Sequence, residues 1–265
     1  MLRSMYSGIS GMRGFQTKLD VIGNNIANVN TSGFKKGRVT FQDMMSQTIR
    51  GAQGTGANRG GINPMQVGLG SQVGSIDNIH TQGFLQSTGN PLDIAIEGNG
   101  YFILDDGDGG YFFTRAGNFY LDEDGYIVNA DGYFLLNTNG GRIQISDNVE
   151  SFSIAKNGDV NIVPADGEPD KIALAIFSNP AGLEKIGGNL YRQTENSGTI
   201  DSPADFSEPG EEGAGDLVAS TLEMSNVDLA EEFTEMIVAQ RGFQANTRII
   251  TTSDEILQEL VNLKR

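Results

Sequence analysis

The sequence contains no cysteine and only one histidine, His80, among its 265 residues. The absence of cysteine excludes disulfides, thiolate metal sites and cysteine nucleophiles, and a single histidine excludes multi-histidine metal centres. The chain has no Gly-Lys pair and therefore no P-loop, and it lacks the GxSxG motif of serine hydrolases. We therefore expect a protein that is not an enzyme and that needs no cofactor or metal.

Long hydrophobic segments are missing as well. No apolar run approaches the length of about 18 residues that suggests a membrane span. The first residues also lack the continuous apolar stretch of a secretory signal peptide. We expect no membrane insertion and no cleaved signal.

Charge is distributed unevenly along the chain, whose formal net charge is −16. Residues 1–50 carry seven basic and two acidic side chains, residues 51–225 carry seven and 25, and residues 226–265 carry four and seven. The acidic centre disfavours nucleic acid as a partner, because phosphate binding requires clustered cations. The two ends have opposite charges, as two mutually binding segments would have.

The N-terminal segment has the spacing of an amphipathic helix. Four glycines, at positions 8, 11, 14 and 23, lie within it, and each costs a helix about 1 kcal/mol relative to alanine. Such a helix is marginal alone and should need a partner surface. Its apolar residues recur at intervals of three or four and fall on one stripe: Leu2, Met5, Ile9, Met12, Phe15, Leu19, Ile22, Ile26 and Val29.

The C-terminal segment has a longer stripe, which begins at Leu229 and contains no proline. Residues 225–228 offer N-cap side chains, and the acids at 231, 232 and 235 suit the positive end of a helix dipole. The alternative is a helix packed on its own domain, but one narrow stripe at each end of the chain favours a helix pair or an assembly. The stripe positions alternate by four and three, which is typical of a coiled-coil strand: Phe233, Met236, Gln240, Phe243, Thr247, Ile250, Asp254, Leu257 and Val261.

Between the helical segments the pattern changes to short strand-like runs. These runs lie at 101–104, 111–114, 126–128, 133–136, 143–145, 160–163 and 172–177. Eight Asn-Gly or Asp-Gly steps, which are preferred in tight hairpin turns, begin at Asn99, Asp106, Asp108, Asp124, Asp131, Asn139, Asn157 and Asp166. The pattern predicts an antiparallel meander that forms a sandwich or a partly closed barrel.

The predicted fold is therefore α+β, with long terminal helices that pair as a coiled coil and a central antiparallel β domain. Residues 1–30 and 229–265 form the helical domain, residues 31–75 a glycine-rich connector and residues 76–228 the β domain. Within the connector, residues 51–74 contain eight glycines and are expected to be extended with little local stiffness. Residues 195–216 are rich in acids, proline, serine and glycine and are expected to form an exposed or mobile loop.

The remaining polar residues have ordinary structural explanations. The acidic turns at 105–108 and 122–125 do not have EF-hand spacing, and hairpins account for them. His80 is expected at the surface of a loop or strand. Asp93 and Glu97 could act as an acid and a base, but we expect both carboxylates to be solvated.

Three stretches carry a specific pattern: LDVIGNNIANVNTSGFK at 19–35, FTRAGNF at 113–119, and EMSNVDL at 223–229 followed by MIVAQRGFQAN at 236–246. Together they resemble the family of bacterial flagellar axial proteins, which comprises hook and rod proteins. The ending 256–265 and residues 227–229 are more similar to hook proteins, whereas the length and residues 41–50 are also similar to the distal rod protein. We interpret the chain as a hook subunit, with the distal rod as the alternative; many hook proteins have an additional outer domain for which this chain has no room.

The resemblance implies a structural role. Subunits would pass unfolded through the flagellar export apparatus, without a cleaved signal, and polymerise at the cell surface into a helical homopolymer. The hook is the flexible coupling that transmits torque from rod to filament, and its partners would be the hook cap, the distal rod and the hook–filament junction proteins. The terminal helices would form an inner layer and the β domain an outer one.

The expected assembly interface consists of apolar stripe residues, because a single chain offers no core large enough to cover them. It comprises Leu2, Met5, Ile9, Met12, Leu19, Ile22, Ile26, Leu229, Phe233, Met236, Phe243, Ile250, Leu257 and Val261.

Overall fold

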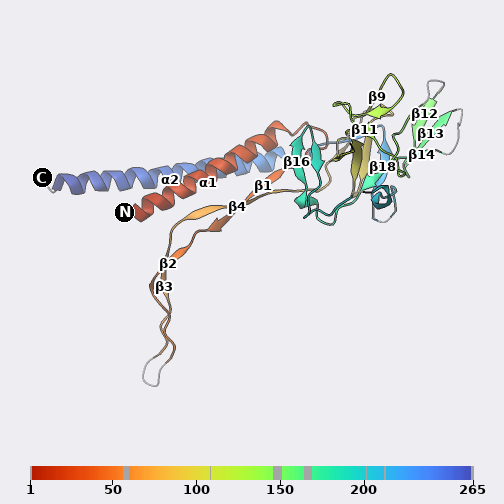
Figure 1. Ribbon diagram of the computed structural model, residues 1–265. Coiled ribbons are helices and arrows are strands. Elements are labelled where there is room, and N and C mark those ends of the chain that lie inside the picture. The colour runs from red at the N-terminus through yellow and green to blue at the C-terminus, as the bar shows by residue number, and fades with distance from the viewer. Residues whose placement is uncertain are drawn as a thin grey trace. The chain divides into compact units, whose positions relative to one another are not determined.

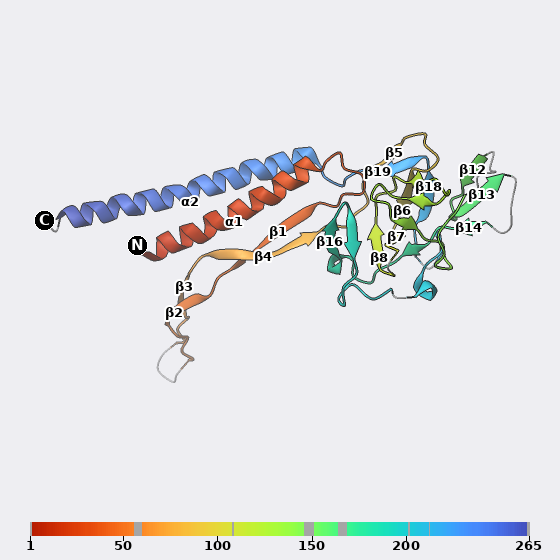
Figure 2. The ribbon, with the colours of Figure 1, turned by 45° about the horizontal axis from the view of Figure 1, so that its top comes forward.

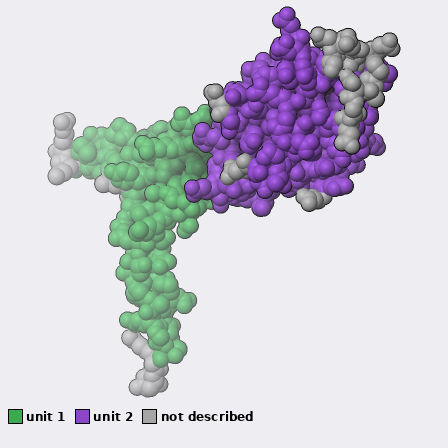
Figure 3. All heavy atoms as spheres, turned by 45° about the vertical axis from the view of Figure 1, so that its right-hand side comes forward, with its two compact units in different colours: residues 1–27, 37–78, 228–265 green, residues 28–36, 79–227 purple. Residues whose placement is uncertain are grey.

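The computed structural model describes residues 2–55, 60–107, 109–145, 151–163, 169–200, 202–211 and 213–263 (Figure 1). The chain forms two compact units, each assembled from separate chain segments (Figure 3). Unit 1 comprises residues 1–27, 37–78 and 228–265, and unit 2 comprises residues 28–36 and 79–227.

Unit 1 contains the two long helices, α1 (Leu2–Ala27) and α2 (Leu229–Leu263). They lie side by side and antiparallel, so the first turn of α1 and the last turns of α2 lie towards the same end of the pair (Figures 1 and 2). Asp228 caps α2 as predicted, because its Oδ1 accepts a hydrogen bond from the backbone N–H of Ala230 at 2.8 Å. Helix α1 ends at Ala27.

The rest of unit 1 is a pair of two-stranded antiparallel ribbons. Strands β1 (Gly37–Asp43) and β4 (Ser71–Asn78) pair and pack against α1 (Figure 2). Strands β2 (Ser46–Arg50) and β3 (Met65–Gly68) pair with each other. Part of the glycine-rich segment 51–74 is therefore held in strands by cross-strand backbone pairing, which its composition does not reveal.

Unit 2 is built from antiparallel strands. The largest sheet has the order β16-β17-β8-β7-β11-β10-β9, with β15 also paired to β7; a second sheet has the order β12-β13-β14, and β18 pairs with β6 and β19 with β5. The strands are β5 (Leu85–Ser87), β6 (Ile94–Glu97), β7 (Tyr101–Asp105), β8 (Tyr111–Thr114), β9 (Tyr120–Leu121), β10 (Ile127–Val128), β11 (Phe134–Leu135), β12 (Ser151–Ile154), β13 (Asp159–Val163), β14 (Asp170–Lys171), β15 (Leu174–Ala175), β16 (Glu184–Gly187), β17 (Leu190–Arg192), β18 (Asp216–Ala219) and β19 (Thr221–Glu223). Short 3₁₀ turns lie at Pro180–Gly182 and Pro203–Asp205.

The predicted α+β class and the central antiparallel β domain are confirmed. In seven of the eight Asn-Gly or Asp-Gly steps the glycine has a positive φ, between +78° and +133°. This left-handed backbone region favours glycine, which explains why the steps mark turns. The eighth step, at 166–167, lies outside the described residues. The run 143–145 forms an isolated bridge at Gln144 rather than a strand.

The core of unit 2 lies on both faces of β7. Phe102 and Leu104 belong to one buried cluster and Tyr101 and Ile103 to the other, because successive side chains of a strand point to opposite faces. The second cluster also contains Ile200 and Phe206. The expectation that residues 195–216 form an exposed loop is therefore wrong for these side chains, which the acidic composition of the segment conceals.

Candidate assembly interface

Small residues line the contact between α1 and α2. Gly242 faces the ring of Phe15, and Gly11 faces the side chain of Asn246. A Cβ atom would lie 2.5 Å from that ring at Gly242 and 2.9 Å from Asn246 Nδ2 at Gly11, closer than real Cβ atoms come. These glycines therefore let the two backbones approach more closely than alanine would.

Polar contacts hold the other half of the helix pair. Lys18 forms an ion pair with Glu235. The buried Asn25 donates to Glu232 Oε2 at 3.2 Å and also binds the backbone of Gly37, donating to its O at 2.9 Å and accepting from its N–H at 3.0 Å. Asn25 thus connects α1 to α2 and to the start of β1.

The predicted interface residues differ in how far unit 1 covers them. Ile22 is buried. Eight are half-buried: Met5, Ile9, Met12, Leu19, Ile26, Met236, Ile250 and Leu257. Four are exposed: Leu229, Phe233, Phe243 and Val261. The side chain of Leu2 lies outside the described residues. The part that these residues play in assembly stays a prediction.

Helix α2 exposes apolar side chains on both sides of the line that contacts α1. That line runs through Ala239, Asn246 and Ser253, and two sets of apolar residues lie roughly 80° to either side of it. The first flank was predicted and comprises Leu229, Phe233, Phe243 and Val261; the second flank was missed and comprises Val238, Ile249, Ile256 and Leu263. The exposed Leu260 continues the contact line itself. The second flank also has helical spacing, so the sequence did contain its signal. Each flank can be covered by another helix.

The C-terminal end of α2 extends beyond α1. Gly8 lies against Ile250, so in an antiparallel pair Leu2 lies level with about residue 256. We call residues 256–263 the overhang, because no part of the described α1 lies beside most of its length. Its Leu260 and Val261 are 49% and 64% exposed.

Unit 2 contains a buried ion cluster. Glu223 Oε1 accepts a hydrogen bond from Lys35 Nζ at 2.6 Å and another from the backbone N–H of Gly83 at 2.9 Å, and its Oε2 accepts one from Arg115 Nη1 at 3.2 Å. The side chains of Lys35 and Glu223 are completely buried. Burial lowers the pKa of Lys35, and the charge of Glu223 opposes that change.

The three charged residues come from three different stretches of the family pattern: Lys35 from 19–35, Arg115 from 113–119 and Glu223 from 223–229. The cations also bind backbone carbonyls, Lys35 that of Thr81 at 2.8 Å and Arg115 that of Gly98 at 2.7 Å. Sequence reasoning missed the cluster because the three residues are far apart in the chain. The only available signal was a charged residue inside each motif.

His80 lies beside this cluster in a loop, and it is half-buried rather than exposed as expected. Its Nδ1 is 2.7 Å from the hydroxyl of Tyr101, and its Nε2 is buried with no hydrogen-bond partner in the described part of the chain. Burial, followed by the cations Lys35, Lys185 and Arg115, lowers the pKa of His80 to about 4. Burial raises the pKa of Tyr101 to about 12, so its hydroxyl stays protonated and donates to Nδ1.

The candidate catalytic carboxylates do not form a site. Asp93 is buried, contrary to expectation, and accepts hydrogen bonds from Thr88 Oγ1 and Asn90 Nδ2. Glu97 is exposed on β6. Within the described ranges, no group of three or more His, Cys, Asp or Glu is placed to hold a metal. Neither described helix is long and apolar enough to cross a membrane.

Comparison with known proteins gives consistent matches along the chain. "Flagella basal body rod protein" matches residues 5–35, "Flagellar hook protein FlgE/F/G D1 domain" residues 95–162, and "Flagellar basal body rod FlgEFG protein C-terminal" residues 218–263. The chain is 62% identical to the flagellar basal-body rod protein FlgG of Bacillus subtilis over 268 positions, which cover 100% of both chains. It is 41% identical to FlgG of Caulobacter vibrioides, with 99% of this chain and 100% of that protein covered. It is 32% identical to the flagellar hook protein FlgE of Borreliella burgdorferi over 446 positions, which cover 100% of both.

Proposed function

The chain belongs to the family of bacterial flagellar rod and hook proteins, and from this premise we propose that it polymerises into the distal rod of the flagellar basal body. Family membership makes it a structural component of the flagellar axis and not an enzyme, as expected from the sequence.

The full-length match to a rod protein is the observation that carries this proposal. The alignment with the FlgG relative needs only 268 positions for a chain of 265 residues, so the two proteins correspond almost without gaps. The alignment with the hook relative needs 446 positions, because that protein contains long segments without a counterpart here. The sequence alone favoured the hook, with the distal rod as the alternative; the full-length match to the rod protein supports the alternative better.

The surfaces of unit 1 support a role as a polymer subunit. Two apolar flanks of α2 and the overhang are exposed in a single chain, and covering them contributes about 25 cal/mol per Å² of apolar area. When different surfaces of one molecule meet, the contact is head-to-tail and produces an open helical filament if the rotation does not close. In this proposal the helices of neighbouring copies pack as a coiled-coil layer around the axis.

The same proposal includes a location and a set of partners. The chain reaches the cell surface through the flagellar export apparatus without cleavage of a signal, and it contacts further copies of itself and the adjoining axial proteins. A hook subunit would instead contact the hook cap, the distal rod and the hook–filament junction proteins.

Deletion of the gene separates the two roles. Electron microscopy of basal bodies from the deletion strain should show a missing distal rod, and expression of the wild-type chain should restore it. A complete rod that lacks only the hook would refute the rod assignment and establish the hook. A complete rod and hook would refute both roles.

A further inference from the structure

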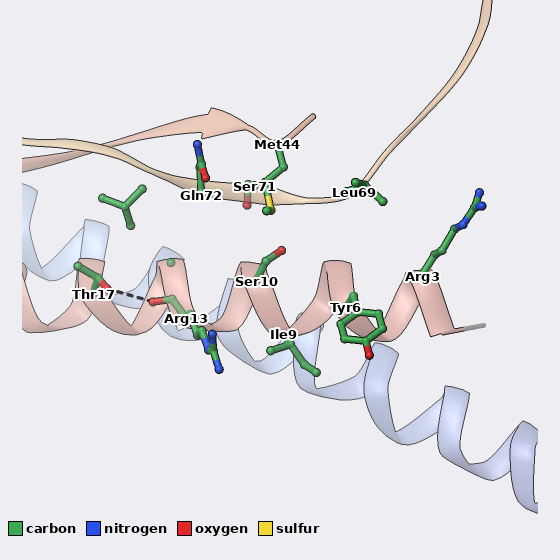
Figure 4. Close-up of a pocket in the computed structure, with 12 residues that line it drawn as sticks. Arg3, Tyr6, Ile9, Ser10, Arg13, Thr17, Met44, Leu69, Ser71 and Gln72 are labelled. Carbon is green, nitrogen blue, oxygen red and sulfur yellow. Dashed lines mark hydrogen bonds between the residues drawn. The ribbon is translucent and has the colours of Figure 1, made fainter. Parts of the chain in front are cut away.

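Unit 1 contains an apolar groove of about 600 Å³ between α1 and the loop side of the β1–β4 ribbon (Figure 4). Tyr6 and Ile9 of α1 line it on one side, and Leu69 and Val73 line it on the other. The ribbon lies tightly on the helix here, because a Cβ atom at Gly70 would be 2.3 Å from Ser10 Oγ. At this point the ribbon therefore closely approaches the helix that forms the other wall of the groove.

The charged residues that line this otherwise apolar groove are basic. Arg3 and Arg13 are among its lining residues, and none of the lining residues is acidic. Both arginines are exposed, and neither forms an ion pair with another described residue. Arg3, Tyr6 and Arg13 follow helical spacing, which places the two cations on one side of α1 with an apolar ring between them. An occupant of this groove should be apolar with acidic residues at its edge.

The overhang of α2 has this character. Ile256, Leu260 and Leu263 are spaced by four and three and form one apolar ridge of the helix, and all are exposed. Glu255 and Glu259 precede the first two of these residues and lie along one edge of the ridge. The ridge thus complements the groove in both polarity and charge.

The overhang cannot enter the groove of its own chain. Gly8 lies against Ile250, so Ile9 lies level with about residue 249 of the same chain. Leu260 is then roughly 16 Å farther along the helix axis, since each residue rises by about 1.5 Å. An overhang that enters this groove must therefore come from a second copy.

We propose that the groove between α1 and the β1–β4 ribbon receives the overhang of a second copy of this chain. Ile256, Leu260 and Leu263 of one copy pack against Tyr6 and Ile9 of the other, and Glu255 and Glu259 pair with Arg3 and Arg13. Groove and overhang are different surfaces, so the contact repeats head-to-tail. The inference rests on the proposed polymeric function and assigns one of its contacts.

The absence of native cysteine makes the contact accessible to disulfide trapping. The variant Ile9→Cys/Leu260→Cys should form disulfide-linked dimers and longer ladders when basal bodies purified from cells are oxidised. A disulfide requires Cα atoms within about 7 Å, so the two cysteines of one chain, about 16 Å apart, cannot react with each other. Each single variant, and the pair Ile9→Cys/Glu231→Cys, serve as controls that should remain monomeric on a denaturing gel.

Charge exchange between copies supplies an independent test. Arg3→Glu/Arg13→Glu and Glu255→Arg/Glu259→Arg should each abolish rod assembly when expressed alone, because like charges then meet. Co-expression of the two variants should restore assembly. The native acidic overhang of the groove variant fits the native basic groove of the overhang variant, and the basic overhang of the latter fits the acidic groove of the former. A chain with all four changes should assemble as well, which shows that the variants fold and are exported.

The outcomes separate this inference from the proposed function. Rods that contain the chain but yield no ladder, or variant pairs that do not rescue each other, would refute the groove assignment and leave the rod function standing. If the chain is absent from purified rods and hooks, both are refuted.

Discussion

The buried carboxylate of Glu223 should be essential to the stability of unit 2. Glu223→Gln keeps the shape of the side chain and an acceptor for the N–H of Gly83, but it leaves the cations of Lys35 and Arg115 without a counter-charge. Removing one partner of a buried ion pair costs about 3–5 kcal/mol, because the remaining charge stays buried. Both cations keep one backbone carbonyl each, so we expect the free energy of unfolding to fall by about 4 kcal/mol.

Urea unfolding monitored by near-UV circular dichroism measures this loss. The buried rings of Tyr101 and Tyr191 report on unit 2 rather than on the helices. With a denaturant slope of about 2–3 kcal/mol per molar, the midpoint should fall by roughly 1.5–2 M. Glu184→Gln is a matched control: its ion pair with Arg192 is exposed and should contribute less than about 1 kcal/mol.

A double-mutant cycle identifies the cause of the loss. Lys35→Met in the Glu223→Gln background removes a cation that no longer has a carboxylate beside it, so the double variant should lose clearly less than the sum of the two single variants. Losses that add, or a Glu223→Gln midpoint equal to that of the wild type, would show that the cluster is not an energetic unit.

His80, the contact of Gly242 with Phe15, and Leu257 each allow a direct test. His80 is neutral in both the folded and the unfolded state well above pH 6.5, whereas between about pH 6.5 and 4 only the unfolded chain gains its proton. The free energy of unfolding should therefore fall by at most about 3.4 kcal/mol on acidification, and urea titrations of His80→Gln should lack this component. Gly242→Leu should force Phe15 and α2 apart, which should lower the free energy of unfolding by about 1–3 kcal/mol and speed amide exchange in α1. Gly23→Ala is the control and should be neutral or stabilising, because nothing lies within 4 Å of the new Cβ. Equal amide exchange in both variants would contradict the close contact. Leu257→Asp should block polymerisation, measured by sedimentation, without changing the near-UV melting of unit 2, and a large fall in that melting temperature would show that α2 belongs to the core of its own chain.

Local patterns predicted the turns and the main strands well. Glycine after Asn or Asp marks the turns because the left-handed backbone is a property of single residues, and the paired turns then place β7 and β8 beside each other. The start of α2 could also be predicted from a local pattern, because Asp228 caps the helix by binding the backbone N–H of Ala230, two residues further on.

Hydrophobic periodicity identified the face on which the helices meet only in part. The predicted stripes included Phe15 and Ile250, which lie in the contact, but the α2 stripe did not include Gly242 or Asn246, which face Phe15 and Gly11. Close packing of backbones uses small residues, which a hydrophobic pattern does not register. Glycines 8 and 11 were interpreted only as a cost to helix formation, although they permit the contact.

Contacts between residues far apart in the sequence were the second feature that local patterns did not predict. His80 and Asp93 were expected in water because a single polar residue between strands is usually exposed. Their burial depends on Tyr101, Thr88 and other residues that only the fold places around them.

The ion cluster also has a mechanical consequence. Within unit 2, the segment that continues from α1 is fastened to the strand that leads to α2: Gly33 donates its backbone N–H to the carbonyl of Glu223 at 2.8 Å, and Lys35 pairs with the carboxylate of the same residue. Tension that enters along either segment is therefore shared by these two bonds, which act in parallel. In a rotating shaft, where every subunit is loaded in shear, this cross-tie would make both ends of the chain bear the torque as one.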